Sequence, residues 1–230
     1  MAGLEVHMVS DLNSEMVEAV VNSKPNRMDR RRLETRNKLL AATLKLVTDK
    51  GVEKTTMSDI SDAADLGRRT FYNHFTSKEE CIIAAAVGEL QKLSIKVMGL
   101  ISPNDDPALV VATSTQFVMR SLTKQPIVMC LVDNPRMLGA ALFAAVGQFV
   151  HQDMEKGIEQ KRFNPPLRGQ LLDNMMKWTL VGLLVENTES DAELAKSLVG
   201  YSQAFLMILG LGNEEAEAVS LLAEQDLKGA

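Results

Sequence analysis

Residues 56–80 read TMSDISDAADLGRRTFYNHFTSKEE. Thr56, followed three residues later by Asp59, is a capping-box pattern, so a short helix is predicted from Thr56 to about Ala64. Only a turn separates it from a second short helix over residues 67–75. Two short helices joined by a tight turn are the elements of a helix-turn-helix, whose second helix enters the DNA major groove.

The second helix has one apolar and one polar face. At about 100° per residue, Phe71 and Phe75 share the inward face, and Arg69 points almost directly away from it. The polar face therefore carries Arg69, Thr70, Tyr72 and Asn73. Guanidinium, hydroxyl, phenol and amide groups read base edges and bind phosphates, so this face is the predicted DNA-reading surface. The alternative is an ordinary solvated helix face.

The helix predicted over residues 29–50 is unusually basic at its start. Its predicted apolar stripe consists of Leu33, Leu40, Leu44 and Val47. Residues 24–80 hold 13 Lys+Arg and 9 Asp+Glu, whereas the remainder of the chain holds 12 and 21. Because basic segments attract phosphate backbones, we expect backbone contacts from this helix, at Arg31 and Arg36. The alternative is a basic surface without a partner.

Helices are predicted along the rest of the chain as well. Helix-favouring residues recur, alternating strand-like runs are missing, and Gly and Pro cluster at a few breaks. The expected helices after the motif cover residues 77–101, 107–123, 135–161, 166–187, 191–210 and 213–227. The first of these opens with a second capping-box pattern, from Ser77 to Glu80. A further apolar stripe over residues 11–22 predicts either a docked arm or a frayed end.

The composition excludes several classes of protein. With 230 residues, 46% of them apolar and 24% charged, the chain suits a folded protein rather than a disordered one. No apolar run reaches the roughly 18 residues of a spanning helix, and the N-terminus lacks a secretion signal, so we expect a cytoplasmic protein with no membrane partner. Cys81 and Cys130 are too few for a disulfide framework and lack metal-ligand spacing.

An enzyme is the main rival class, and the sequence lacks the constellations that one would need. We find no HExxH, no GxSxG, no glycine-rich phosphate loop and no metal-spaced His/Cys set. We therefore expect no enzyme activity, no cofactor and no metal site. Cys81 follows a helix N-terminus and could act as a redox switch, although its place in the second turn favours burial.

The block over residues 56–80 resembles the TetR (tetracycline repressor) family of bacterial transcription regulators, with TFYNHFTSKE as its specific signature. The resemblance covers about residues 30–85. It implies a homodimer, a three-helix DNA-binding head on each subunit, and an effector pocket inside a larger helical body. The chain departs from the family at Asp65, commonly Gly, and at Gly67, often Ser. Asp tolerates positive φ and Gly can cap a helix, so both departures are compatible with the motif.

The resemblance also implies roles for single residues. The family's phosphate-contacting tyrosine matches Tyr72, its lysine at the start of the next helix matches Lys78, and its threonine at the start of the first helix matches Thr56. With the polar face and the basic helix, the predicted contacts to a double-stranded operator are Thr56, Arg68, Arg69, Thr70, Tyr72, Asn73, His74, Lys78, Arg31 and Arg36.

The predicted fold is therefore all-α, with an N-terminal three-helix DNA-binding domain followed by a larger helical domain for ligand binding and dimerisation. Residues 1–28 form an extension or arm, residues 29–76 the helix-turn-helix domain, and residues 77–230 the larger domain. The predicted function is that of a ligand-responsive regulator, a repressor that binds a palindromic operator as a dimer. The alternative is a dimeric ligand-binding or redox-sensing protein whose helix-turn-helix has lost or changed its DNA role.

Two helices near the C-terminus are apolar nearly all round. Residues 197–213 and 178–185 contain no charged side chain. Two copies meeting as a four-helix bundle would bury both helices, with Gly182 and Gly200 allowing close approach. The predicted seam consists of Leu194, Leu198, Tyr201, Phe205 and Ile208. The alternative is a helix buried within one subunit.

Candidate effector contacts are polar or aromatic groups at helical spacing in the larger domain. They are Arg120, Gln148, His151, Met175 and Trp178. On the helix over residues 135–161, Gln148 and His151 follow Ala140 and Ala144 on one stripe, so small residues precede an amide and an imidazole. A pocket is mostly apolar with a few placed polar groups, which favours a small apolar or aromatic effector. For each residue the alternative is an ordinary surface or core position.

Overall fold

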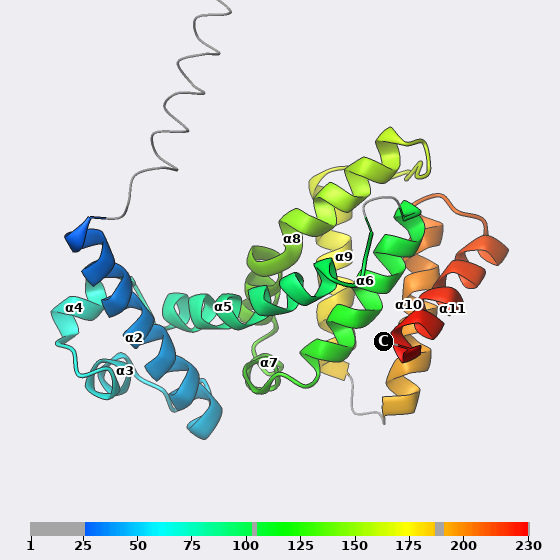
Figure 1. Cartoon of the computed structure of the whole chain (residues 1–230). Coiled ribbons are helices and arrows are strands. Elements are labelled where there is room, and N and C mark those ends of the chain that lie inside the picture. Colours follow the sequence, from blue (N-terminus) through cyan, green and yellow to red (C-terminus); the bar gives the residue numbers. More distant parts are fainter. Residues whose placement is uncertain (1–25, 103–104, 187–190, 230) are drawn as a thin grey trace, which may run out of the picture. The chain divides into compact units, whose positions relative to one another are not determined.

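The computed structural model describes residues 26–102, 105–186 and 191–229, and every regular element within these ranges is a helix (Figure 1). The all-α prediction is therefore confirmed. The helix or arm predicted over residues 11–22 lies outside the described residues.

The first described helix, α2 (Arg27–Lys50), starts two residues earlier than predicted. The Asn26 side chain accepts hydrogen bonds from the backbone N–H groups of Met28 at 2.8 Å and Asp29 at 2.9 Å, which satisfies the free donors of the first turn. After Lys50 the chain leaves the helix through Gly51, whose φ of +83° is accessible to glycine at little cost.

The buried side of α2 differs in part from the predicted stripe. Its buried residues are Leu39, Thr43 and Val47, whereas Leu33 is 58% exposed. The chain divides into two compact units within this helix, between residues 38 and 39, so only the later turns of α2 contribute to the core of the second unit. The domain boundaries expected after residues 28 and 76 stay predictions.

The predicted helix-turn-helix is present as α3 (Met57–Ala63) and α4 (Arg68–Tyr72). Asp65 in the turn has a φ of +55°, a conformation that Asp adopts more readily than most residues. Gly67 occupies the N-cap of α4 and provides no side-chain hydrogen bond. The core of this region consists of Leu39, Ile60, Ala64, Phe71, Phe75 and Cys81.

Helix α5 (Lys78–Met98) connects this core to the next one. Cys81 belongs to the helix-turn-helix core, whereas Ile82 and Leu90 belong to a core shared with later helices. The capping box predicted at its start is only half formed. The Ser77 side chain accepts from the Glu80 N–H at 3.1 Å, but the Glu80 carboxylate turns to the backbone and hydroxyl of Thr76, at 2.6 Å each.

Six further helices follow: α6 (Pro107–Leu122), α7 (Pro126–Leu131), α8 (Pro135–Glu159), α9 (Gln170–Glu186), α10 (Asp191–Ile208) and α11 (Asn213–Gly229). The short α7 was not predicted, because a six-residue helix that begins at Pro126 carries too little periodicity. Helix α9 starts later than the predicted residue 166. The loop before it contains Pro165, Pro166 and Gly169, and the last has a φ of +60°.

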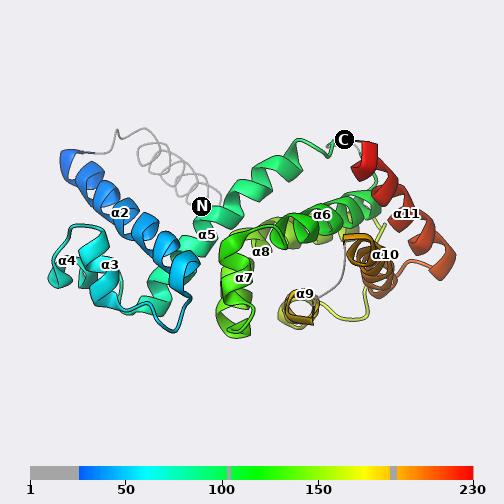
Figure 2. The same ribbon diagram turned by 90° about the horizontal axis from the view of Figure 1, so that it is seen from below.

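The later helices pack into two cores. Helix α8 contacts α5, α6, α7 and α9, while α6, α10 and α11 contact one another (Figure 2). The second core includes Phe163, which is 2% exposed and lies in the loop after α8. Gly157 of α8 makes room for its ring, since a Cβ at this glycine would lie 2.1 Å from Phe163 Cδ2.

Candidate functional site

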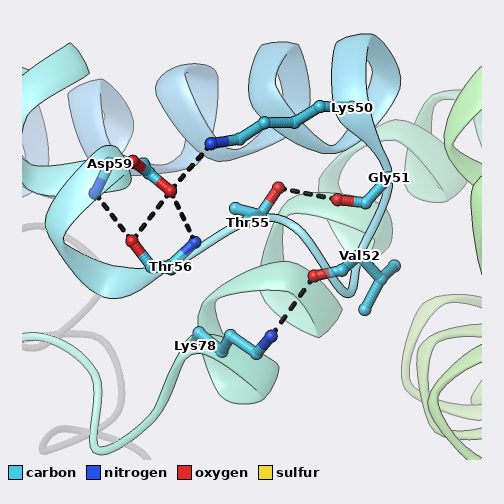
Figure 3. A network of polar contacts seen from close by, with 7 residues as sticks. All are labelled: Lys50, Gly51, Val52, Thr55, Thr56, Asp59 and Lys78. Carbon is cyan, nitrogen blue, oxygen red and sulfur yellow. Dashed lines mark hydrogen bonds and ion pairs between the residues drawn. The ribbon is translucent and has the colours of Figure 1, made fainter.

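The start of α3 is held by a network of charged and polar groups (Figure 3). The Thr56 hydroxyl accepts from the Asp59 N–H at 3.2 Å, and the Asp59 carboxylate accepts from the Thr56 N–H at 2.9 Å. The same carboxylate accepts from Lys50 Nζ at 2.7 Å. The predicted capping box is therefore present, and Lys50 ties it to the last turn of α2.

This network keeps Asp59 ionised. Hydrogen bonds from Lys50 and then Thr56 lower the pKa of Asp59 from 3.8 to about 2. Because the folded-state pKa is depressed, the carboxylate stabilises the folded chain above about pH 4, and this contribution is lost as the pH falls toward 2.

Replacing Thr56 tests the importance of this cap. Thr56→Ala removes the side-chain acceptor for the Asp59 N–H and is expected to lower the free energy of unfolding by about 1 kcal/mol, measured by urea denaturation. Thr56→Ser keeps the hydroxyl and is the matched control. An equal loss in both variants would assign the effect to the methyl group rather than to the cap.

Lys78, at the first position of α5, reaches back to the loop after α2. Its Nζ donates to the Val52 carbonyl at 3.3 Å (Figure 3). In the same loop the Thr55 hydroxyl donates to the Gly51 carbonyl at 2.7 Å. An ammonium group has three donors, so this contact leaves donors of Lys78 for a phosphate beside the N-terminus of α5.

The two faces of α4 are as predicted. Phe71 and Phe75 are 0% and 2% exposed, whereas Arg69 and Asn73 are exposed and Tyr72 is 55% exposed. Thr70 and His74, also predicted as DNA contacts, are half-buried.

A polar notch of about 190 Å³ lies between the start of α3 and α4. It is lined by Thr56, Met57, Ser58, Ser61, Arg68, Phe71 and Tyr72. Arg68 Nη2 donates to Ser58 Oγ at 2.9 Å, which orients the guanidinium along this notch. Ser58 and Ser61 were not among the predicted contacts, although their spacing of three residues places them on one side of α3. Hydroxyls and a guanidinium together suit a phosphate oxygen.

The arginines of α2 lie on its first turns. Arg31 is exposed, and Arg36 is half-buried. The Arg31 carbonyl accepts from the Thr35 hydroxyl at 2.8 Å, a bond within the helix that leaves the guanidinium to other partners.

A largely apolar cavity of about 240 Å³ lies between α5, α6, α8 and α9. Its lining consists of Val97, Ile101, Val111, Ser114, Thr115, Val118, Met119, Val146, Phe149, Val150, Gln152, Asp153, Met176 and Leu180. An apolar wall with a few polar groups is typical of a small-molecule site.

None of the five predicted effector residues lines this cavity. Arg120 forms an ion pair with Glu224 of α11, and burial lowers the pKa of Arg120. Met175 packs against the second core, and Trp178 is 47% exposed.

The predicted stripe on α8 faces away from the cavity. Gln148 and His151 are exposed, and His151 Nδ1 lies 3.7 Å from Asp173 Oδ1. The cavity face of α8 instead carries Val146, Phe149, Val150 and Asp153. The sequence prediction failed here because Ala140 and Ala144, the small residues of the predicted stripe, face solvent and leave no room for a ligand.

The predicted dimer seam faces the core of its own chain instead of a partner. Leu194, Leu198 and Phe205 are at most 5% exposed within the single chain. The exposed apolar residues of these two helices are Leu171, Trp178 and Val185 on α9 and Ala204 and Met207 on α10. We call this set the outer face. Gly182 and Gly200 have open space around them, and Gly200 is exposed in α10.

The described residues offer few features of other kinds of site. Within the described ranges, no three His, Cys, Asp or Glu side chains are grouped so that they could hold a metal ion. No helix there is long and apolar enough to cross a membrane. Cys81 is fully buried, with its Sγ 3.1 Å from Thr43 Oγ1, which argues against a redox role.

Comparison with known proteins gives consistent matches. Residues 39–85 match the profile of the bacterial regulatory proteins of the tetR family. The chain is 30% identical over 159 residues to an uncharacterized HTH-type transcriptional regulator, YvdT of Bacillus subtilis (strain 168), an alignment that covers 66% of this chain and 78% of that protein. It is 39% identical over 56 residues to the HTH-type transcriptional regulator TcmR of Streptomyces glaucescens, covering 24% and 25% of the two chains.

Solved structures share the fold. RolR in complex with resorcinol superposes with a TM-score of 0.69 at 22% identity, covering 83% of this chain and 95% of RolR. FadR of Thermus thermophilus in complex with lauroyl-CoA gives 0.60 at 19% identity, covering 77% and 96%. Both likenesses show a common helical architecture.

Proposed function

The chain belongs to the TetR family of bacterial transcription regulators, and from this we propose that it is a cytoplasmic repressor that binds a palindromic DNA operator as a homodimer and is released by a small effector. The observation that carries the DNA part is the exposed polar face of α4 above buried Phe71 and Phe75, next to the notch at the start of α3. No observation on the described residues favours the alternative of a protein without a DNA role.

The proposed contacts divide into two kinds. Arg69 and Asn73 read base edges, since an arginine and an amide are the side chains that pair bidentately with guanine and adenine. Phosphate and backbone contacts come from the remaining predicted residues: Thr56, Arg68, Thr70, Tyr72, His74, Lys78, Arg31 and Arg36. The notch supports this division, because it gathers hydroxyls and the Arg68 guanidinium beside α4.

Substitution of Arg69 and Lys78 tests the division. Arg69→Ala is expected to weaken operator binding by roughly 1 to 3 kcal/mol and to relax sequence preference, because a base contact is lost. Lys78→Ala is expected to weaken operator and random DNA alike and to reduce the salt slope by about 1, because a phosphate contact is lost. Fluorescence anisotropy with operator and random duplexes over a range of salt measures both.

Lys124→Ala is the matched control, since it removes one exposed positive charge in the loop after α6. It should leave operator affinity nearly unchanged. If Arg69→Ala and Lys78→Ala weakened specific and random DNA by the same factor, the division into base and phosphate contacts would be wrong.

The outer face supports the homodimer. Helix α9 presents Leu171, Trp178 and Val185 to solvent and α10 presents Met207 beside Ala204, and a second copy would bury them as a four-helix bundle. A two-fold dimer places two recognition helices about 34–36 Å apart for successive major grooves of a palindrome.

The cavity supports control by an effector. Helix α5 carries Lys78 at its start and the cavity-lining Val97 near its end, so one rigid element joins the DNA-binding region to the cavity. A ligand that fits the cavity in only one position of α5 would shift the population toward that position. Resorcinol and lauroyl-CoA, the ligands bound to RolR and FadR, are the first probes for release of a labelled operator. Saturable binding in the cavity with unchanged operator affinity would count against release by that ligand.

A further inference from the structure

Four polar residues line the cavity. Helix α6 contributes Ser114 and Thr115, and α8 contributes Gln152 and Asp153. The other lining residues are apolar. On α8 the carboxyl of Asp153 follows Val146 by seven residues, so it shares the face that Val146 directs into the cavity. Asp153 is thus the single acidic residue in the lining of this cavity.

The charge of Asp153 has few stabilising partners in the protein. No hydrogen bond to its carboxylate is found among the described residues, and burial raises its pKa while the charge of Lys156 lowers it. Asp153 is half-buried. A carboxylate partly removed from water without a hydrogen-bond donor is destabilised, and a donor arriving with a ligand would recover part of that cost.

Ser114 provides a second, independent indication. Its hydroxyl oxygen is buried and has no hydrogen-bond partner in the structure. Buried hydroxyls are nearly always bonded, so an unpaired one lining a cavity is suited to a polar atom of a guest molecule.

We propose that the cavity binds a small, largely apolar ligand that carries a hydrogen-bond donor, a hydroxyl or an amine, directed at the Asp153 carboxylate with Ser114 as a second polar contact. The proposal rests on the effector role of the cavity proposed above. The same carboxylate disfavours ligands with an acidic head, since like charges in an apolar site repel. Asp153 is thus the residue that determines ligand specificity.

Four ligands with one ring system test the proposal: naphthalenemethanol, naphthalenemethylamine, methylnaphthalene and naphthoate. Isothermal titration calorimetry of the full chain measures each affinity. The alcohol or the amine is expected to bind at least tenfold more tightly than methylnaphthalene, as a hydrogen bond to a charged group provides. Naphthoate is expected to bind most weakly. Comparison of the alcohol with the amine shows whether a neutral or a cationic donor is preferred.

Two variants assign the preference to Asp153. Asp153→Leu keeps a side chain of similar size and is expected to abolish the donor preference while it still binds methylnaphthalene, which also shows that the variant is folded. Glu155→Leu makes the same kind of change at an exposed position of α8 and should keep the preference. If Asp153→Leu did not fold, Asp153→Asn would replace it, with an expected gain in naphthoate affinity and a smaller donor preference, because the like charge is removed and a neutral amide accepts a weaker hydrogen bond.

Three results would overturn the proposal: no binding of any member to the wild-type chain, equal binding of methylnaphthalene and the donors, or a donor preference that survives in Asp153→Leu. Operator release, measured separately by anisotropy with the same compounds, tests the effector role. Asp153-dependent binding without release would refute the effector role and leave the ligand specificity intact.

Discussion

Ala204→Glu is expected to convert the proposed dimer into a monomer and to weaken operator binding by at least a hundredfold. Ala204 lies on the outer face, on the exposed side of α10 between Gly200 and Met207. In a four-helix bundle the new carboxylate would be buried against the partner without a counter-charge. The free-energy cost of burying this charge exceeds the stabilisation that the small alanine contact provides. A monomer holds one recognition helix, and linking two binding modules typically raises affinity by about 10² to 10⁴.

Sedimentation velocity and anisotropy with the operator measure the two effects. Ala218→Glu is the matched control, because Ala218 is an exposed alanine of α11 outside the outer face. Circular dichroism should be unchanged in both variants, since each side chain points to solvent in the single chain. A dimeric Ala204→Glu protein with full operator affinity would contradict the placement of the interface on the outer face.

Gly157→Ala is expected to lower the free energy of unfolding by about 3 kcal/mol, near the upper end of overpacking effects. The added methyl group would lie 2.1 and 2.2 Å from two ring carbons of Phe163, far inside van der Waals contact. The ring is 2% exposed and belongs to the core that includes Met154 and Leu209, so it has little room to move.

Urea denaturation measures the loss, and Gly88→Ala is the control. Gly88 also lies inside a helix, but a Cβ there meets no atom within 4 Å, so alanine should stabilise the chain by roughly 0.5 to 1 kcal/mol through helix propensity. The double variant Gly157→Ala/Phe163→Leu should recover part of the loss, since the two sites are in direct contact. An equal change in the free energy of unfolding for the two glycine variants would show that the Phe163 ring moves aside without a loss of stability.

The helix-turn-helix could be predicted from the sequence because its determinants are local. The cap at Thr56 requires a hydroxyl and a carboxylate three residues apart, and both are present in the printed sequence. Phe71 and Phe75 mark the side of α4 that faces the core. Arg69 lies on the opposite side of the helix, so its outward direction followed from helical geometry alone.

The orientations of the long helices could not be predicted in the same way. Helix α10 is apolar on nearly every side, so its sequence did not distinguish the face buried against its own chain, at Leu198 and Phe205, from the face left open at Ala204 and Met207. Periodicity specifies a face only where polar residues mark the opposite one.

The sequence by itself determined the all-α class, the helix-turn-helix and the polar face of its second helix. Helix caps and the helical spacing of apolar residues are both set by side chains only a few residues apart. Only the tertiary structure decided where the cavity and the outer face lie. The cavity depends on how α5, α6, α8 and α9 are rotated against one another, and the outer face on which sides of α9 and α10 the rest of the chain buries. Asp153 and Ser114 line the same cavity only because distant segments pack together, and no spacing along the chain encodes that arrangement.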